Sequence, residues 1–181
     1  MIETKLQDHW IGSALHQFEG PLIRYAMTFT RDLGLAQDVV QDAFLKLLKE
    51  DRNKVADHLA PWLFKVCRNR ALEILRKDKR MTFTSDTLTT DSPSREHDPA
   101  RQTADREMTE KMFQMLLTLP ENQQEVVRLK FQNGMSYKEI SSITNLSVSN
   151  VGYLLHQAVK SLRHALRGPF DLAPETGRSL S

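Results

Sequence analysis

A polar face at the start of one helical pattern carries side chains that are well suited to chemistry. Beyond Ser147, apolar residues recur at helical spacing, and the positions between them point outward. These outward positions are Ser149, Asn150, Gly152, Tyr153, His156 and, further along, Lys160. Hydroxyl, amide and imidazole groups can bond to base edges, and lysine suits phosphate. The pattern indicates a helix that reads DNA, although its spacing alone also fits an ordinary solvated helical hairpin.

The preceding residues would position that helix. Ser136 and Glu139 have the spacing of a capping box, so Ser136 and Tyr137 open a short helix. Ile140 and Ile143 would face inward, Asn145 would turn the chain, and Ser147 would cap the next helix. Val148, Val151, Leu154, Leu155, Ala158, Leu162 and Ala165 would form the apolar stripe of that helix. Two helices joined by a tight turn predict a helix-turn-helix.

Residues 52–80 form a second candidate surface. They hold nine basic residues against three acidic ones, a local net charge of +6 in a chain whose total is only +2. A compact basic face attracts phosphate because bound counterions are released. Trp62, beside it, could stack on an unpaired base. The alternative is a solvated helix face with Trp62 in the core, and composition alone does not decide between the two.

Sites for catalysis or metal binding are weakly indicated. The six histidines are scattered without the spacing of metal ligands, and no glycine-rich phosphate loop is present. Cys67 lies on an apolar face and is expected to be a small core residue. The interpretation is a protein that is not an enzyme, with no catalytic residues, no metal and no cofactor.

The elements that carry these residues are helical throughout. The fold class expected is all-α, with two small helical domains joined by a flexible linker. The first domain covers 1–80, a polar and acidic linker covers 81–107, the helix-turn-helix domain covers 108–168, and a flexible tail covers 169–181. Pro21 would kink or restart the first helix, 51–60 would be a loop, and Pro61 would open the basic helix. No membrane span or signal sequence is recognised, so a cytoplasmic protein is expected.

Three motifs together resemble the extracytoplasmic-function (ECF) subfamily of bacterial sigma factors. Residues 36–44, AQDVVQDAF, are similar to the family's acidic helix, AEDLVQETF. Residues 61–71, PWLFKVCRNRA, and the basic run to Arg80 are similar to its WLFTIARNLARDRLRRRRR stretch. Residues 119–140, from LP to SYKEI, are similar to LP…REVFLLRFVEGLSYEEIA. All three occur in the family's order and at its usual separations.

The resemblance implies a sigma factor that joins core RNA polymerase and directs it to promoters, so its first domain would bind core polymerase and the minus-ten element. The residues implied at the core polymerase are Asp38, Gln41, Asp42 and Phe44. Those implied at minus-ten DNA and the melted non-template strand are Arg52, Lys54, Trp62, Lys65, Arg68, Asn69, Arg76, Lys77 and Arg80. The resemblance leaves open whether an anti-sigma factor controls the protein.

The second domain would read the minus-thirty-five element in double-stranded promoter DNA. The residues implied there are Ser136, Tyr137, Ser147, Ser149, Asn150, Gly152, Tyr153, His156 and Lys160. Many relatives read VGTVKSRLHRAR in this helix, whereas this chain has Asn150 for the threonine, Gly152 for a basic residue and Tyr153 for the serine. The promoter sequence therefore cannot be copied from better-known relatives.

Two other functions remain as alternatives at this point. A stand-alone helix-turn-helix regulator would share the C-terminal half of the argument, but it would have no use for the basic helix or for residues 36–44. An adaptor that binds polymerase without reading promoters would share only the first half. A small hydrolase or nuclease is disfavoured because no paired carboxylates or metal ligands are evident.

Overall fold

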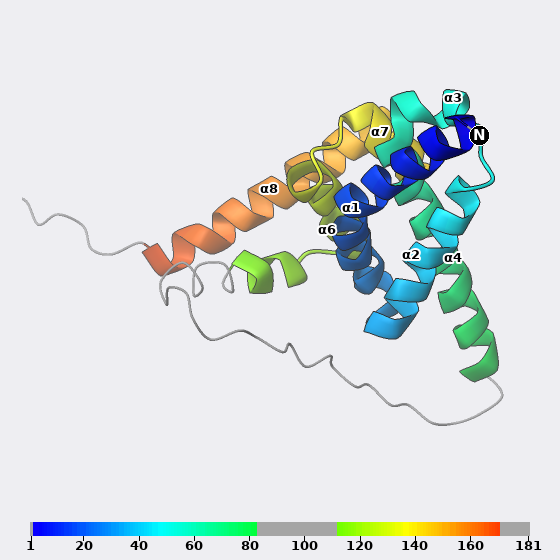
Figure 1. The fold of residues 1–181 in the computed structure, drawn as a ribbon. Helices are drawn as coiled ribbons and strands as arrows, with labels where there is room; N and C mark the ends of the chain where they lie inside the picture. Colours follow the sequence, from blue (N-terminus) through cyan, green and yellow to red (C-terminus); the bar gives the residue numbers. More distant parts are fainter. Residues whose placement is uncertain (1, 83–111, 171–181) are drawn as a thin grey trace, which may run out of the picture.

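The structure is a computed structural model that describes residues 2–82 and 112–170, all of which form helices, turns or short connections without a strand (Figure 1). The first bundle consists of α1 (Ile2–Thr30), α2 (Leu33–Leu47) and α4 (Leu59–Thr82), with the short α3 (Arg52–Val55) and the 3₁₀ turn η1 (Ala56–His58) between α2 and α4. The all-α expectation is confirmed for the described residues.

The core of the first bundle is built from apolar side chains on the facing sides of three helices. Leu22, Val39, Leu47, Leu63 and Phe64 are almost fully buried where α1, α2 and α4 pack together. Asp32 caps α2, because its Oδ1 accepts a hydrogen bond of 2.7 Å from the backbone N–H of Leu35. The positions of the three helices are therefore set by apolar burial and a local cap.

The helix α1 runs unbroken through Pro21, so of the two alternatives expected there, a kink or a restart, the restart does not occur. Two other expectations about helix boundaries in this bundle are wrong. Residues 51–60 are mostly helical rather than a loop, because Asp51 caps α3 and Val55 is buried. The helix α4 begins at Leu59, so Pro61 lies inside its first turn, where no backbone donor is needed.

The second bundle contains α6 (Glu121–Val127), the π-helical turn η2 (Arg128–Gln132), α7 (Tyr137–Thr144) and α8 (Val148–Phe170). Residues 112–117 are also helical. Val126, Leu129, Ile140, Ile143 and Val151 are fully buried. The helix α6 continues directly into η2, where the chain is wound as a π-helix, and this segment ends before Gly134, which has φ +68°.

The two bundles pack against each other. The helix α7 contacts α4, and Figure 1 shows α7 beside the first part of α4, whose other end extends away from the second bundle. The helix α8 runs on to Phe170, slightly beyond the predicted end of the domain. The predicted linker, from residue 83 on, and most of the predicted tail lie outside the described residues.

Candidate nucleic-acid interface

The helix-turn-helix is formed by α7 and α8 with the local bonds that the sequence predicts. The backbone N–H of Glu139 donates to Ser136 Oγ over 3.3 Å, and the N–H of Ser136 donates to Glu139 Oε2 over 2.7 Å. Asn145 adopts a left-handed φ of 59° and turns the chain. The N–H of Asn150 then donates to Ser147 Oγ over 3.2 Å, so Ser147 caps α8. The capping box, the turn and the second cap are confirmed.

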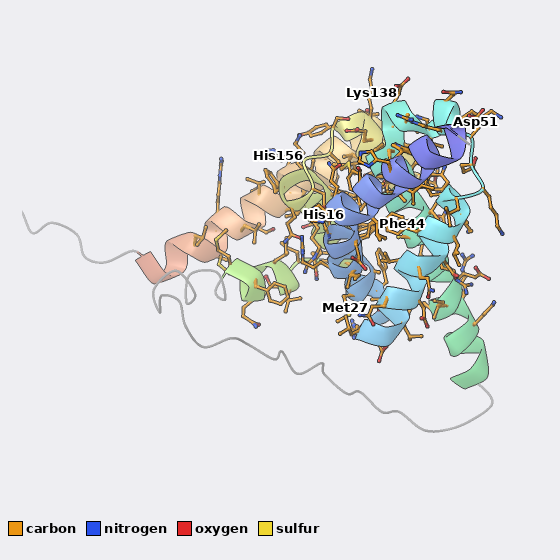
Figure 2. All side chains as sticks on the ribbon, in the orientation of Figure 1. His16, Met27, Phe44, Asp51, Lys138 and His156 are labelled. Carbon is orange, nitrogen blue, oxygen red and sulfur yellow. The ribbon has the colours of Figure 1, made fainter. Side chains whose placement is uncertain are left out.

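The predicted reading face of α8 is exposed. Its exposed members are Ser147, Ser149, Asn150, Tyr153, His156 and Lys160, while Gly152 is half-buried. Figure 2 shows His156 on α8 and Lys138 on α7, both separated from Phe44 in the first bundle. Two members of the predicted apolar stripe are exposed instead, Val148 and Ala165. Val148 is the first helical residue of α8 and is 44% exposed.

Tyr137 connects α7 to the reading helix. A Cβ atom on Gly152 would lie 3.6 Å from Tyr137 Cε2, an ordinary van der Waals contact. The ring of Tyr137 also has a cation near it: Lys130 Nζ lies 5.5 Å from the ring centre and donates to the carbonyl of Met135 over 3.2 Å. Lys130 is thus a cation beside the predicted interface that the sequence analysis missed. The π-helical turn that places it carried no recognisable sequence signal.

The basic face of α4 is partly engaged in contacts within the protein. Arg76 Nε donates to the carbonyl of Leu72 over 3.1 Å, and Lys77 pairs with Glu73 over 3.1 Å, yet both side chains remain exposed. Asn69 is exposed and Lys65 is half-buried. Arg68 is bound to Glu125 of the second bundle. The side chain of Arg80 lies outside the described residues.

Residues that precede α4 in the chain extend the basic face of α4. The guanidinium of Arg52 lies 5.7 Å from the centre of the Trp10 ring, and Lys54 is exposed beside it. Trp62 is partly buried against the hydrophobic core. Part of the Trp62 side chain therefore contributes to packing, as the core alternative stated, while the rest stays accessible.

A separate face of the first bundle carries the predicted acidic residues. Asp38 and Gln41 are exposed on α2, but Asp42 is bound to Arg70 and Phe44 is only 6% exposed. Phe44 and Gln41 both line a groove of about 380 Å³ between α1 and α2. The groove is lined by Leu15, Glu19, Ile23, Gln37, Val40, Gln41, Phe44, Leu45 and Leu48. Phe44 is therefore buried beneath this face, whereas Leu15, Leu45 and Leu48 are the exposed apolar side chains that line the groove.

Chemistry by cysteine or by a metal finds no support in the described residues. Cys67 is fully buried, and burial raises the pKa of its thiol to about 12. Within residues 2–82 and 112–170, no group of histidine, cysteine and acidic side chains could hold a metal ion. No helix in the same ranges is long and apolar enough to cross a bilayer.

Comparisons with known proteins match both bundles. A family model described as Sigma-70 region 2 covers residues 15–81, and one described as Sigma-70, region 4 covers residues 109–162. The chain is 27% identical over 154 residues to the ECF RNA polymerase sigma factor SigM of Bacillus subtilis, covering 84% of this chain and 93% of SigM. It is 27% identical over 149 residues to the RNA polymerase sigma factor YlaC of the same organism, covering 81% and 86%.

Solved structures share the fold. The sigma factor RpoE of Bartonella quintana, crystallised in complex with the anti-sigma factor NepR, superposes with a TM-score of 0.65 at 22% identity, covering 89% of this chain and 98% of RpoE. CnrH in complex with the cytosolic domain of CnrY superposes with a TM-score of 0.57 at 21% identity, covering 89% and 90%.

Proposed function

Since the chain belongs to the sigma-70 family of RNA polymerase sigma factors, in the ECF subfamily, we propose that three of its surfaces have distinct roles in promoter-directed transcription initiation. These surfaces are the exposed part of α8, the basic surface of α3 and α4, and the α1–α2 face. The observation that carries the function is the order of the two matched regions. Region 2 falls on the bundle that contains the basic helix α4, and region 4 falls on the helix-turn-helix. A stand-alone operator-binding regulator would account for the second match only.

The exposed N-terminal part of α8 is proposed to read the minus-thirty-five element in the major groove. Asn150, Tyr153 and His156 offer amide, phenol and imidazole groups to base edges. Ser136, Tyr137, Ser147, Ser149, Gly152 and Lys160 would contact the sugar-phosphate backbone or set how closely α8 approaches it. Lys130, behind Tyr137, would add a cation to the same backbone contacts.

The surface formed by α3 and α4 is proposed to bind the minus-ten element. Its exposed cations would neutralise phosphates, and the accessible part of Trp62 would stack on an unpaired base of the non-template strand. The proposed members are Arg52, Lys54, Trp62, Lys65, Arg68, Asn69, Arg76, Lys77 and Arg80. Arg68 is a special case because it is bound to Glu125.

The α1–α2 face is proposed to dock on core RNA polymerase. The amide of Gln41 lines an apolar groove with exposed leucines, and the exposed carboxylate of Asp38 belongs to the same helix, α2. An apolar centre with a polar edge is the usual composition of a protein–protein interface. Asp42 and Phe44 would contribute by holding this face in shape.

Membership of the sigma-70 family also bears on catalysis, on cellular location and on a further partner. The protein acts as an initiation factor, and we propose that the nucleotide chemistry belongs to core polymerase rather than to this chain. We propose a cytoplasmic location because the polymerase works on the chromosome there. An anti-sigma factor is proposed as a further partner, since the similar protein RpoE binds one.

In vitro transcription tests this function. The purified chain and bacterial core polymerase would be incubated with a pool of genomic fragments, and transcript starts would be mapped. We expect discrete starts that appear only when the chain is present. Core binding without new starts would favour an adaptor, and tight operator binding without polymerase would favour a stand-alone regulator.

A further inference from the structure

The N-terminal part of α8 carries no arginine or lysine. Residues 148–159 contain neither residue type, and the first of them in the helix is Lys160. Residues near the N-terminus of the second helix of a helix-turn-helix contact base edges. Lys160 lies about 18 Å further along the helix than Val148, so it is placed for phosphate rather than for those base edges. The bidentate contact of a cation with guanine, the commonest specific contact to a base, is therefore missing from this part of α8.

Cations of neighbouring elements do not replace that contact. Lys130 Nζ donates to the carbonyl of Met135 over 3.2 Å and lies 5.5 Å from the centre of the Tyr137 ring, so it is held against the protein. Lys138 is exposed near the start of α7 (Figure 2). The first helix of a helix-turn-helix crosses the sugar-phosphate backbone, where a lysine neutralises phosphate. Both lysines can therefore add affinity for any DNA sequence, but they do not select guanine.

Asn150 offers the carboxamide that is best placed for a base. It is exposed in the first turn of α8, and the cap uses its backbone N–H, which donates to Ser147 Oγ over 3.2 Å. Its side chain has an oxygen that accepts and an NH₂ group that donates, the pair that matches the N6 amino group and N7 of adenine. Gln157, the other amide among residues 148–159, is half-buried and about two turns further along. Adenine is therefore the base that this face can recognise with two hydrogen bonds.

The residues that follow Asn150 on the accessible side of α8 are small or aromatic. Gly152 has no side chain, and the ring of Tyr137 lies beside its backbone, since a Cβ atom there would be 3.6 Å from Tyr137 Cε2. Tyr153 is 61% exposed, so most of its ring is accessible. Apolar side-chain groups distinguish thymine from the other bases, because its C5-methyl group faces the major groove. Tyr153 is thus placed to select thymine, as Asn150 is placed to select adenine.

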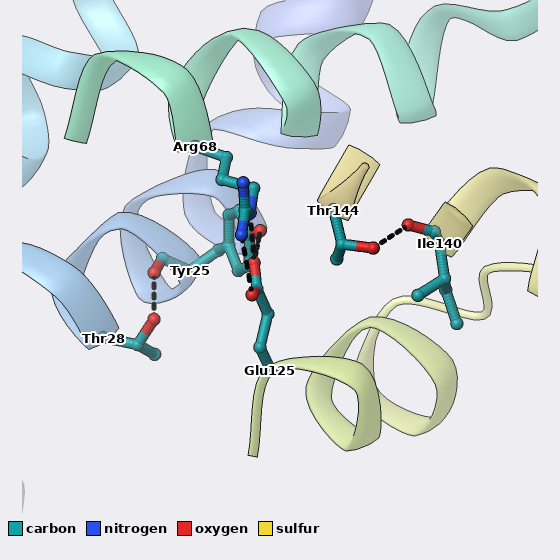
Figure 3. Close-up of polar contacts among 6 residues, drawn as sticks. All are labelled: Tyr25, Thr28, Arg68, Glu125, Ile140 and Thr144. Atoms are coloured by element: carbon teal, nitrogen blue, oxygen red, sulfur yellow. Dashed lines mark hydrogen bonds and ion pairs between the residues drawn. The ribbon is translucent and has the colours of Figure 1, made fainter. Parts of the chain in front are cut away.

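Hydrogen bonds in α7 and in the turn fix the point where α8 begins. Thr144 Oγ1 donates to the carbonyl of Ile140 over 2.7 Å at the end of α7 (Figure 3). Ser141 Oγ donates to the carbonyl of Leu146 over 2.6 Å, which bonds α7 to the turn. Because Ser147 then caps α8, the first turn of the reading helix is held in place, and little backbone freedom is lost on binding. Each side chain of that turn should therefore correspond to one base position.

We propose that α8 selects A·T base pairs in the minus-thirty-five element, with Asn150 bound to an adenine and Tyr153 in contact with a thymine methyl group. Phosphate contacts from neighbouring lysines provide affinity, while these two side chains provide base selection. The inference rests on the proposed function, because it assigns a base preference to the same surface. It goes further by naming the base that each side chain reads.

Transcription from a randomised promoter library tests the preference. Holoenzyme made from the full chain and bacterial core polymerase would transcribe barcoded copies of one mapped promoter whose minus-thirty-five element is randomised. We expect A·T pairs to be enriched among the transcripts, with adenine favoured about tenfold at one position. Transcripts that show no base preference, or enrichment of G·C pairs throughout the element, would overturn the inference alone. A library without transcripts would overturn the proposed function and this inference with it.

Modified bases test the two assigned contacts atom by atom. 7-Deazaadenine lacks the N7 acceptor, so at the adenine position it should weaken holoenzyme binding about fivefold for the parent chain and leave Asn150→Ala unaffected. Uracil lacks the methyl group of thymine, so it should weaken binding about fourfold for the parent chain and leave Tyr153→Ala unaffected. A structural role of either side chain would not produce this dependence on one atom of the DNA. Equal losses in the parent chain and in Asn150→Ala would overturn the proposal.

A change of specificity and a matched control complete the test. Asn150→Arg should move the preference at the same position from adenine to guanine, because a guanidinium bonds to O6 and N7 together. Asn122→Ala is the control, since Asn122 is also an exposed amide but lies on α6, and it should keep every base preference of the parent chain. Lys160→Gln should weaken binding to all sequences equally. Circular dichroism would confirm that each variant is folded. A loss of the adenine preference in Asn122→Ala equal to that in Asn150→Ala would contradict a specific role for Asn150.

Discussion

The guanidinium of Arg70 in α4 donates a hydrogen bond to the carboxylate of Asp42 in α2, with 2.7 Å between Nε and Oδ2. Because of this bond, Asp38 and Asp42 differ in the structure although they look equivalent in the sequence. Asp42 connects two helices of the first bundle, whereas Asp38, one turn earlier, is exposed. The polymerase-docking role proposed for α2 should therefore be tested at Asp38 first.

We expect Asp38→Arg to weaken binding to core polymerase about tenfold without lowering the thermal midpoint, because reversing an exposed charge at an interface creates repulsion. Binding would be measured by a titration of labelled chain with core polymerase. Glu50→Lys, at an exposed position beyond α2, is the control and should bind as the parent does. Equal affinities for Asp38→Arg and the parent would remove Asp38 from the interface.

Asp42→Asn should behave differently. It should lower the free energy of unfolding by about 1 kcal/mol or less, since both Asp42 and Arg70 are about one-third exposed and water screens their attraction. Denaturant unfolding would measure the change. An unaltered stability would show that the bond to Arg70 contributes nothing measurable.

Neutralising two cations of α4 should alter how holoenzyme binding depends on salt. Arg76→Gln with Lys77→Gln should reduce the slope of log K against log salt concentration by about two units, since each phosphate contact contributes roughly 0.9. Open-complex formation at several salt concentrations provides the measurement. The double variant Lys46→Gln and Lys49→Gln, on α2 and just beyond it, removes the same charge and should keep the slope of the parent chain.

Gly152→Ala tests how closely α8 approaches DNA. The new Cβ would meet Tyr137 at an ordinary contact distance, so the domain should fold and gain up to about 1 kcal/mol in stability. We expect weaker binding to minus-thirty-five DNA because the added methyl group would hold the backbone away. Gly12→Ala, in open space on α1, should stabilise its helix without affecting DNA. Normal promoter binding by Gly152→Ala would contradict the close approach.

The capping box predicts a pH dependence of stability. Hydrogen bonds from the side chain and backbone of Ser136 lower the pKa of Glu139 below its ordinary value of 4.5. The ionised form is therefore favoured by folding, and its stabilisation is complete above pH 4.5 and lost as pH falls through the lower folded value. Thermal unfolding between pH 3 and pH 7 should show a smaller acid loss in Glu139→Gln than in the parent chain. Parallel profiles would rule out this contribution.

Features that depend on local chemistry can be read from the amino-acid sequence alone. The capping box at Ser136 and Glu139, the turn at Asn145 and the cap at Ser147 follow from residue types, because each is satisfied within a few residues. The inward stripes of α2 and α8 follow from helical periodicity for the same reason. The three ordered motifs likewise identify the family, since each is a run of neighbouring residues.

Features that depend on distant partners emerge only when the helices pack together. Glu125 is just one of several polar residues in its segment, and it bonds to Arg68 and Tyr25, 57 and 100 residues away, only where α6 meets α4 and α1. The same holds for the burial of Phe44 and for Asp42, whose partner Arg70 lies on another helix. Periodicity indicates which side of a helix is apolar, but it does not show which neighbour covers that side. That choice is made by packing between elements far apart in the chain.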